Sequence, residues 1–74
     1  MITQEQAFKI IGLFQTAYKE SYRDSTPEEI EQKAAIYRDI LQDYTFEQVQ
    51  AGIRAYMSEN HQYEPKPGQI IAKI

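Results

Sequence analysis

His61 is the single histidine of the chain and the first residue to consider as a metal ligand, because Glu59 and Glu64 lie close to it in the sequence. A metal site of this kind needs three or four ligands at suitable spacing. The chain contains no cysteine, so a thiolate cannot complete such a set. We therefore predict that His61 is a solvent-facing loop histidine and that the chain holds no metal site.

Asp39 and Asp43 are the other residues whose spacing suggests chemistry. They are four positions apart, so on a helix they share a face. Paired carboxylates act as acid and base when burial or crowding separates their pKa values. These two stand beside Arg38 and Gln42, which indicates a solvated polar face. The chain has no nucleophile motif, P-loop or dinucleotide fingerprint, so we predict no catalytic residues and no enzyme.

Length and composition limit the class of protein. Seventy-four residues form at most one domain, which we expect to span 1–74. The formal net charge is −3, the opposite of what a phosphate-binding surface usually carries. No apolar run is long enough to cross a bilayer, and the N-terminus lacks the features of a signal peptide. We expect a cytoplasmic protein with no direct contact to nucleic acid or membrane.

Two helices are expected before residue 45. The first runs from about Gln4 to about Glu20, with Thr3 as the N-cap and Gln6 completing a capping box. The second begins at Pro27, behind a serine or threonine cap, and ends near Asp43. Both have wide apolar stripes at helical spacing. The short connection to the next helix predicts that the second and third helices are antiparallel or sharply crossed neighbours.

The central helix is expected over the stretch from Thr45 to Met57. Thr45 is a good N-cap, and Gln48 completes a second capping box. Gly52 lies at the edge of the apolar stripe. Because glycine in a helix costs about 1 kcal/mol relative to alanine, we expect another backbone to approach closely there. Pro67 can open a short fourth helix. The predicted fold is all-α, a small bundle of three main helices and a short C-terminal one.

Some apolar side chains lie outside the central stripes of the first two helices. An exposed apolar patch on a small domain usually marks a binding partner, whereas a compact bundle also needs wide stripes to close its core. With both explanations open, we predict four partner-binding residues: Phe8, Leu13, Ile36 and Ile40.

The second and third helices also invite comparison with a helix-turn-helix DNA-binding module. In that alternative, Gln48, Gln50 and Arg54 would read the bases. Glu47 lies in the first turn of the supposed recognition helix, where its charge would repel phosphate. A DNA-binding module is therefore the alternative function and not the preferred one.

A resemblance to a known family covers nearly the whole chain. It is carried by the run Tyr37-x-x-x-Leu41-x-x-Tyr44-Thr45-Phe46-x-x-Val49-x-x-Gly52-Ile53-x-x-Tyr56, followed by Tyr63-x-Pro65-x-Pro67-x-x-Ile70. This order resembles the phage loader and inhibitor family that acts on replicative DNA helicases. The chain departs from the family at Tyr37, where tryptophan is frequent, and at Lys66, which separates two prolines that are often adjacent.

The resemblance implies the folded N-terminal domain of a phage or prophage replication protein. Such a protein binds the replicative helicase, holds it inactive and delivers it to an origin-bound initiator protein. The resemblance also implies a flexible tail after the folded part, and the abrupt apolar end at Ile74 leads us to expect one. It implies no metal, nucleotide or other cofactor bound by this domain, and it supplies no contact residues.

Overall fold

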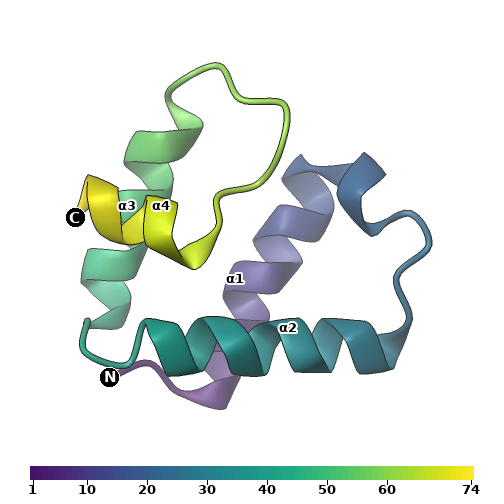
Figure 1. Cartoon of the computed structure of the whole chain (residues 1–74), viewed down its shortest axis with the longest axis horizontal. Helices are drawn as coiled ribbons and strands as arrows, with labels where there is room; N and C mark the ends of the chain where they lie inside the picture. Colours follow the sequence, from purple (N-terminus) through teal and green to yellow (C-terminus); the bar gives the residue numbers. More distant parts are fainter.

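The computed structural model describes residues 1–74 and contains α-helices and no strands (Figure 1). Helix α1 spans Gln4–Ala17, α2 spans Pro27–Ile40, α3 spans Phe46–Met57 and α4 spans Pro67–Lys73, and a short 3₁₀ helix, η1, spans Lys19–Tyr22. This order confirms the prediction of an all-α fold with three main helices and a short C-terminal helix opened by Pro67.

The helix starts follow the predicted capping chemistry. The Thr3 hydroxyl accepts a hydrogen bond from the Gln6 amide, and the Gln6 side chain accepts one from the Thr3 amide in return. Thr45 and Gln48 form the same reciprocal pair at the start of α3. Each capping box satisfies two amides that the first turn would leave unpaired.

Two helices end earlier than the sequence predicts. Helix α1 ends at Ala17 and not near Glu20, because Tyr18 leaves the helical region (φ −126°, ψ 61°). The break turns the chain into η1 and carries Tyr22 into the core. Helix α2 ends at Ile40 and not near Asp43, because Leu41 adopts φ −94° and ψ 12° and buries its side chain.

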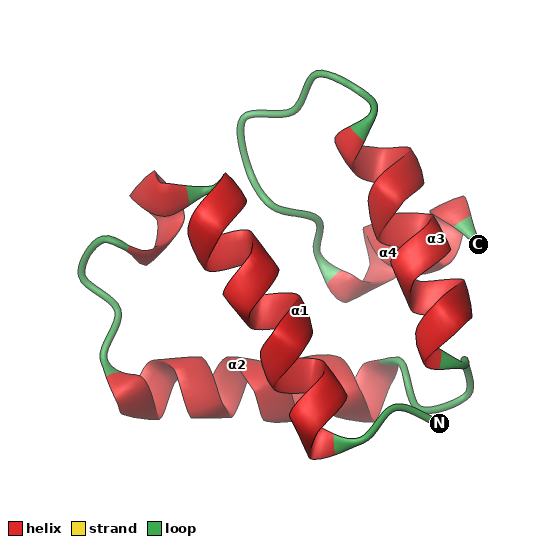
Figure 2. Cartoon of the chain, turned by 180° about the vertical axis from the view of Figure 1, so that it is seen from behind, coloured by secondary structure: helices red, strands yellow, loops and turns green.

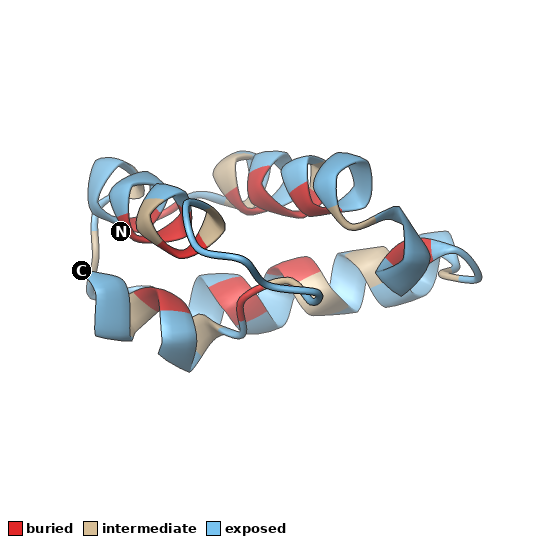
Figure 3. Cartoon of the chain, turned by 90° about the horizontal axis from the view of Figure 1, so that it is seen from above, coloured by how far each residue is buried: buried red, intermediate tan, exposed pale blue.

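The helices form two layers, with α1 and α3 in one and α2 and α4 in the other (Figures 1 and 3). Buried residues of the two layers face each other across the gap between them (Figure 3). The main packing pairs are α1 with α2, which cross (Figure 2), and α3 with α4. Helices α2 and α3 are joined by a turn at a steep angle, but they do not form a main packing pair.

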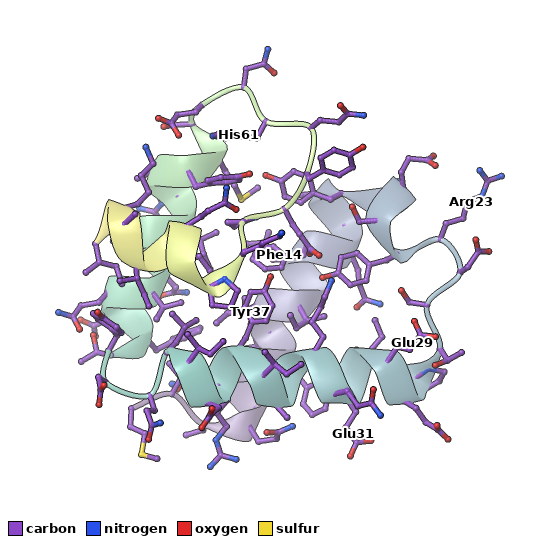
Figure 4. The ribbon with its side chains drawn as sticks, viewed as in Figure 1. Phe14, Arg23, Glu29, Glu31, Tyr37 and His61 are labelled. Carbon is purple, nitrogen blue, oxygen red and sulfur yellow. The ribbon has the colours of Figure 1, made fainter.

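One hydrophobic cluster joins both layers. Phe14 is fully buried at its centre, and its ring meets that of Tyr37 edge to face at 5.9 Å (Figure 4). The cluster contains twelve buried residues: Ile2, Ala7, Ile10, Ile11, Phe14, Tyr22, Ala34, Tyr37, Leu41, Val49, Ile53 and Ile70. Because members come from all four helices, the core depends on both layers at once.

Gly52 lies where α3 meets α4, as the sequence predicts. A β-carbon built on Gly52 would lie 2.8 Å from the carbonyl oxygen of Ile70. That is shorter than any ordinary contact, and the neighbour is a backbone atom that cannot move independently. The absence of a side chain at Gly52 therefore allows α4 to lie directly on α3.

Candidate protein-docking surface

All four side chains predicted to bind a partner are exposed. Their relative exposures are 41% for Phe8, 44% for Leu13, 55% for Ile36 and 45% for Ile40. They do not share one groove: Leu13 lines a groove between α1 and α3, and Ile36 lines another between α2 and the segment 61–69. Phe8 and Ile40 line neither, so the four residues are distributed over separate parts of the surface.

The groove between α1 and α3, called here the α1–α3 groove, has a volume of about 490 Å³ and is mostly apolar. Its floor includes the buried side chains of Ile10 and Ile53, each 3% exposed. Its full lining is Lys9, Ile10, Leu13, Phe46, Gln50, Ile53, Arg54 and Met57. The two charged residues in this set are both cations, although the chain as a whole carries a net charge of −3.

The second groove is larger, about 900 Å³, and more polar. It runs between α2 and the segment that connects α3 to α4. Its charged residues have both signs, with Glu29 and Glu64 against Lys33 and Lys66, so its charge pattern favours no particular partner.

An ion pair fastens the connecting segment to the first half of the chain. The Lys33 ammonium donates to Glu64, and the Tyr22 hydroxyl donates to the other oxygen of the same carboxylate. The Lys33 ammonium also lies 4.4 Å from the centre of the Tyr22 ring. The Glu64 side chain is only 11% exposed, so its charge is held by these two donors and not by bulk water.

Two further tyrosines hold the backbone of this segment. The Tyr37 hydroxyl donates to the Pro65 carbonyl oxygen at 2.8 Å, and the Tyr56 hydroxyl donates to the Tyr63 carbonyl oxygen at 2.7 Å. Tyrosine suits these places because its ring packs in the core while its hydroxyl satisfies a carbonyl. The high tyrosine content therefore serves mainly to fix the aromatic and proline segment on the helices.

The residues considered for acid–base or metal chemistry lie at the surface. His61 is exposed, stacks on the Tyr56 ring at 3.8 Å and lies 2.8 Å from the Glu59 carboxylate (Figure 4). Lys73 also binds Glu59, at 2.7 Å, and these two partners lower the pKa of that carboxyl, Lys73 more than His61. No group of three or more potential ligands gathers anywhere in the chain.

The carboxylate pair on the second helix does not form as predicted. Asp39 is exposed in the last turn of α2, but Asp43 lies beyond the end of that helix. Because α2 stops at Ile40, the two carboxylates do not share a helical face.

Comparison with known families identifies the chain. The family model that matches residues 2–71 describes the N-terminal domain of a phage helicase loader and inhibitor. The chain belongs to this family. The resemblance on which the sequence prediction depends is therefore confirmed. No curated protein and no solved structure shows a significant match to the chain.

The geometry of this loader/inhibitor N-terminal domain gives little support to the helix-turn-helix alternative. In a helix-turn-helix unit the recognition helix presents its first residues to the major groove of DNA. Here the Gln48 side chain is engaged in the capping box at the start of α3. Gln50 and Arg54 line the mostly apolar α1–α3 groove. The three supposed base readers therefore do not form one free polar face.

Several residues of the α1–α3 groove were missed as candidates by sequence reasoning. Lys9 and Leu13 are four positions apart on α1, and Phe46, Gln50, Arg54 and Met57 follow helical spacing along α3. This periodicity is readable in the sequence. The information that α1 and α3 lie beside each other in one layer of the loader/inhibitor domain is a tertiary property that periodicity does not contain.

The buried tyrosines predict a loss of stability at alkaline pH. Burial raises the pKa of both Tyr22 and Tyr37 above the usual value of about 10, and the Glu64 carboxylate adds to both shifts. Below pH 10 this contribution is fully present. As the pH rises above 10, the unfolded chain loses phenolic protons that the folded chain retains, so the free energy of unfolding falls.

Thermal melts between about pH 8 and pH 11.5, read by circular dichroism, measure this fall. Tyr37→Phe is the control, because removing one of the two raised phenols makes the alkaline fall in melting temperature shallower. A melting temperature with the same pH dependence in both proteins would refute the assignment.

Proposed function

We propose that this domain is a protein–protein adaptor in phage or prophage DNA replication, which binds the replicative helicase, inhibits it and assists its loading at the origin. The observation that carries this proposal is membership of the loader/inhibitor family over residues 2–71. The partners are the helicase and, at the loading step, an origin-bound initiator protein. The domain acts stoichiometrically and not as an enzyme.

The exposed apolar side chains supply the contact surface in this proposal. Phe8, Leu13, Ile36 and Ile40 expose between 41% and 55% of their surface in a chain of only 74 residues. Withdrawing such side chains from water contributes roughly 25 cal/mol for each Å² of apolar area. A helicase state that covers them is stabilised relative to one that does not, so the adaptor changes which state is populated.

Inhibition by a stoichiometric adaptor has a definite signature. When the chain is titrated into purified replicative helicase, we expect DNA unwinding to fall and to level off at a fixed ratio of chain to helicase. Three variants locate the contacts: Phe8→Ser, Leu13→Ser, and the double variant Ile36→Ser/Ile40→Ser. Each of these positions is exposed, so folding should be retained and is checked by circular dichroism.

We expect at least one of the three variants to need about tenfold more protein for half-inhibition, the equivalent of about 1.4 kcal/mol. Equal inhibition by all three folded variants would remove these residues from the contact surface. No inhibition and no helicase binding by the unaltered chain would contradict the adaptor function itself.

A further inference from the structure

The α1–α3 groove has the form of a binding site for one helix. Its lining on α3 runs from Phe46 to Met57, the full twelve residues of that helix, and therefore extends about 18 Å along the axis. A guest helix of about three turns has a similar length. Helices α2 and α4 cover the inner side of the layer that α1 and α3 form, and the groove lies open beside that layer (Figure 3).

The apolar part of the groove is suited to a helix with residues at three- and four-residue spacing. Leu13 contributes an exposed side chain on one wall, and Phe46 and Met57 contribute half-buried ones on the other. Between them, Ile10 and Ile53 form a floor that belongs to the hydrophobic core. Because core residues support it, the groove is held open by the fold and not by mobile loops.

The charge of the groove selects among possible guests. Lys9 lies on the α1 wall and Arg54 on the α3 wall, and neither forms an ion pair within the chain. No carboxylate lines the groove, although acidic residues outnumber basic ones by 11 to 8 overall. Two free cations beside an apolar floor complement a guest that carries acidic residues next to its apolar ones.

We propose that the α1–α3 groove binds an amphipathic helix whose apolar face is flanked by acidic residues, and that the helicase supplies this helix. The second clause rests on the proposed function, whereas the chemistry of the guest rests on the groove alone. The apolar residues of the guest cover Ile10 and Ile53, and its carboxylates reach Lys9 and Arg54.

The first test is a charge reversal in the full chain with a matched control. Lys9→Glu/Arg54→Glu inverts both groove cations. Lys19→Glu/Arg23→Glu changes the net charge by the same amount at exposed positions outside the groove. We expect the groove variant to bind the purified helicase at least about tenfold more weakly and the control to bind as the unaltered chain does.

The second test does not need the helicase. The probe is a designed helical peptide of about four turns with leucines at three- and four-residue spacing and glutamates beside them, together with a twin in which glutamine replaces glutamate. We expect the acidic peptide to shift the amide resonances of Lys9, Leu13, Gln50 and Arg54 in the labelled chain. The twin should bind more weakly, and the groove variant should bind neither peptide well.

The outcomes separate this inference from the proposed function. Helicase binding that is equal in the groove variant and the control would overturn the groove as the docking site while leaving the adaptor function intact. Peptide binding in the groove without helicase binding would support the chemistry of the guest and contradict the adaptor function. Equal binding of both peptides, or groove shifts caused by duplex DNA that disappear with added salt, would overturn the preference for an acidic helix.

Discussion

Replacing Ile53 by alanine is expected to destabilise the domain by about 2–5 kcal/mol, the usual cost of a large-to-small change in a packed core. Ile53 is 3% exposed and belongs to the cluster that joins both layers. A chain of this size rarely draws more than roughly 3–5 kcal/mol of net stability from its core. The variant should therefore be largely unfolded at room temperature.

Urea denaturation followed by circular dichroism measures this effect. Gln50→Ala is the matched control, because Gln50 is exposed on the same helix and its truncation should change stability by less than about 0.5 kcal/mol. If Ile53→Ala cost no more than this control, α3 would not be the central element of the core.

Gly52 and Gly12 should respond to alanine with opposite signs. Alanine inside a helix is normally favoured over glycine by about 1 kcal/mol. At Gly12 in α1 nothing lies within 4 Å of an added β-carbon, so Gly12→Ala should be stabilising. At Gly52 the new methyl meets the Ile70 carbonyl oxygen at 2.8 Å, and relieving such overpacking costs about 1–3 kcal/mol.

The difference between the two alanine variants is therefore expected to be about 2–4 kcal/mol, the sum of the propensity and overpacking effects. Denaturant midpoints of the two proteins, measured side by side, give this difference directly. Equal stabilisation by both substitutions would show that α4 does not press on the α3 backbone at Gly52.

Local sequence signals predicted most of the fold. The threonine caps at Thr3 and Thr45, the proline at the start of α2 and the glycine at the α3–α4 contact each state a local requirement that the structure meets. The helix ends were less predictable. Tyr18 and Leu41 leave their helices because Tyr22 and Leu41 itself gain burial in the core, and that gain depends on residues far away in the sequence.

Exposure of the candidate contacts was also predictable, but their arrangement was not. Helical periodicity correctly placed Leu13 and Ile36 outside the main stripes. It could not show that they line different grooves, because this depends on which helices share a layer. The link from Tyr22 and Lys33 to Glu64 joins positions 42 and 31 residues apart, so no local pattern reveals it.

The central claim is that the chain contacts the replicative helicase directly. Analytical ultracentrifugation of the purified chain mixed with purified helicase tests it, with duplex DNA as a parallel partner. We expect a saturable complex with the helicase at micromolar concentrations and moderate salt, and no complex with DNA. Absence of a helicase complex, together with salt-sensitive binding to duplex DNA, would contradict the adaptor function and favour a DNA-binding module.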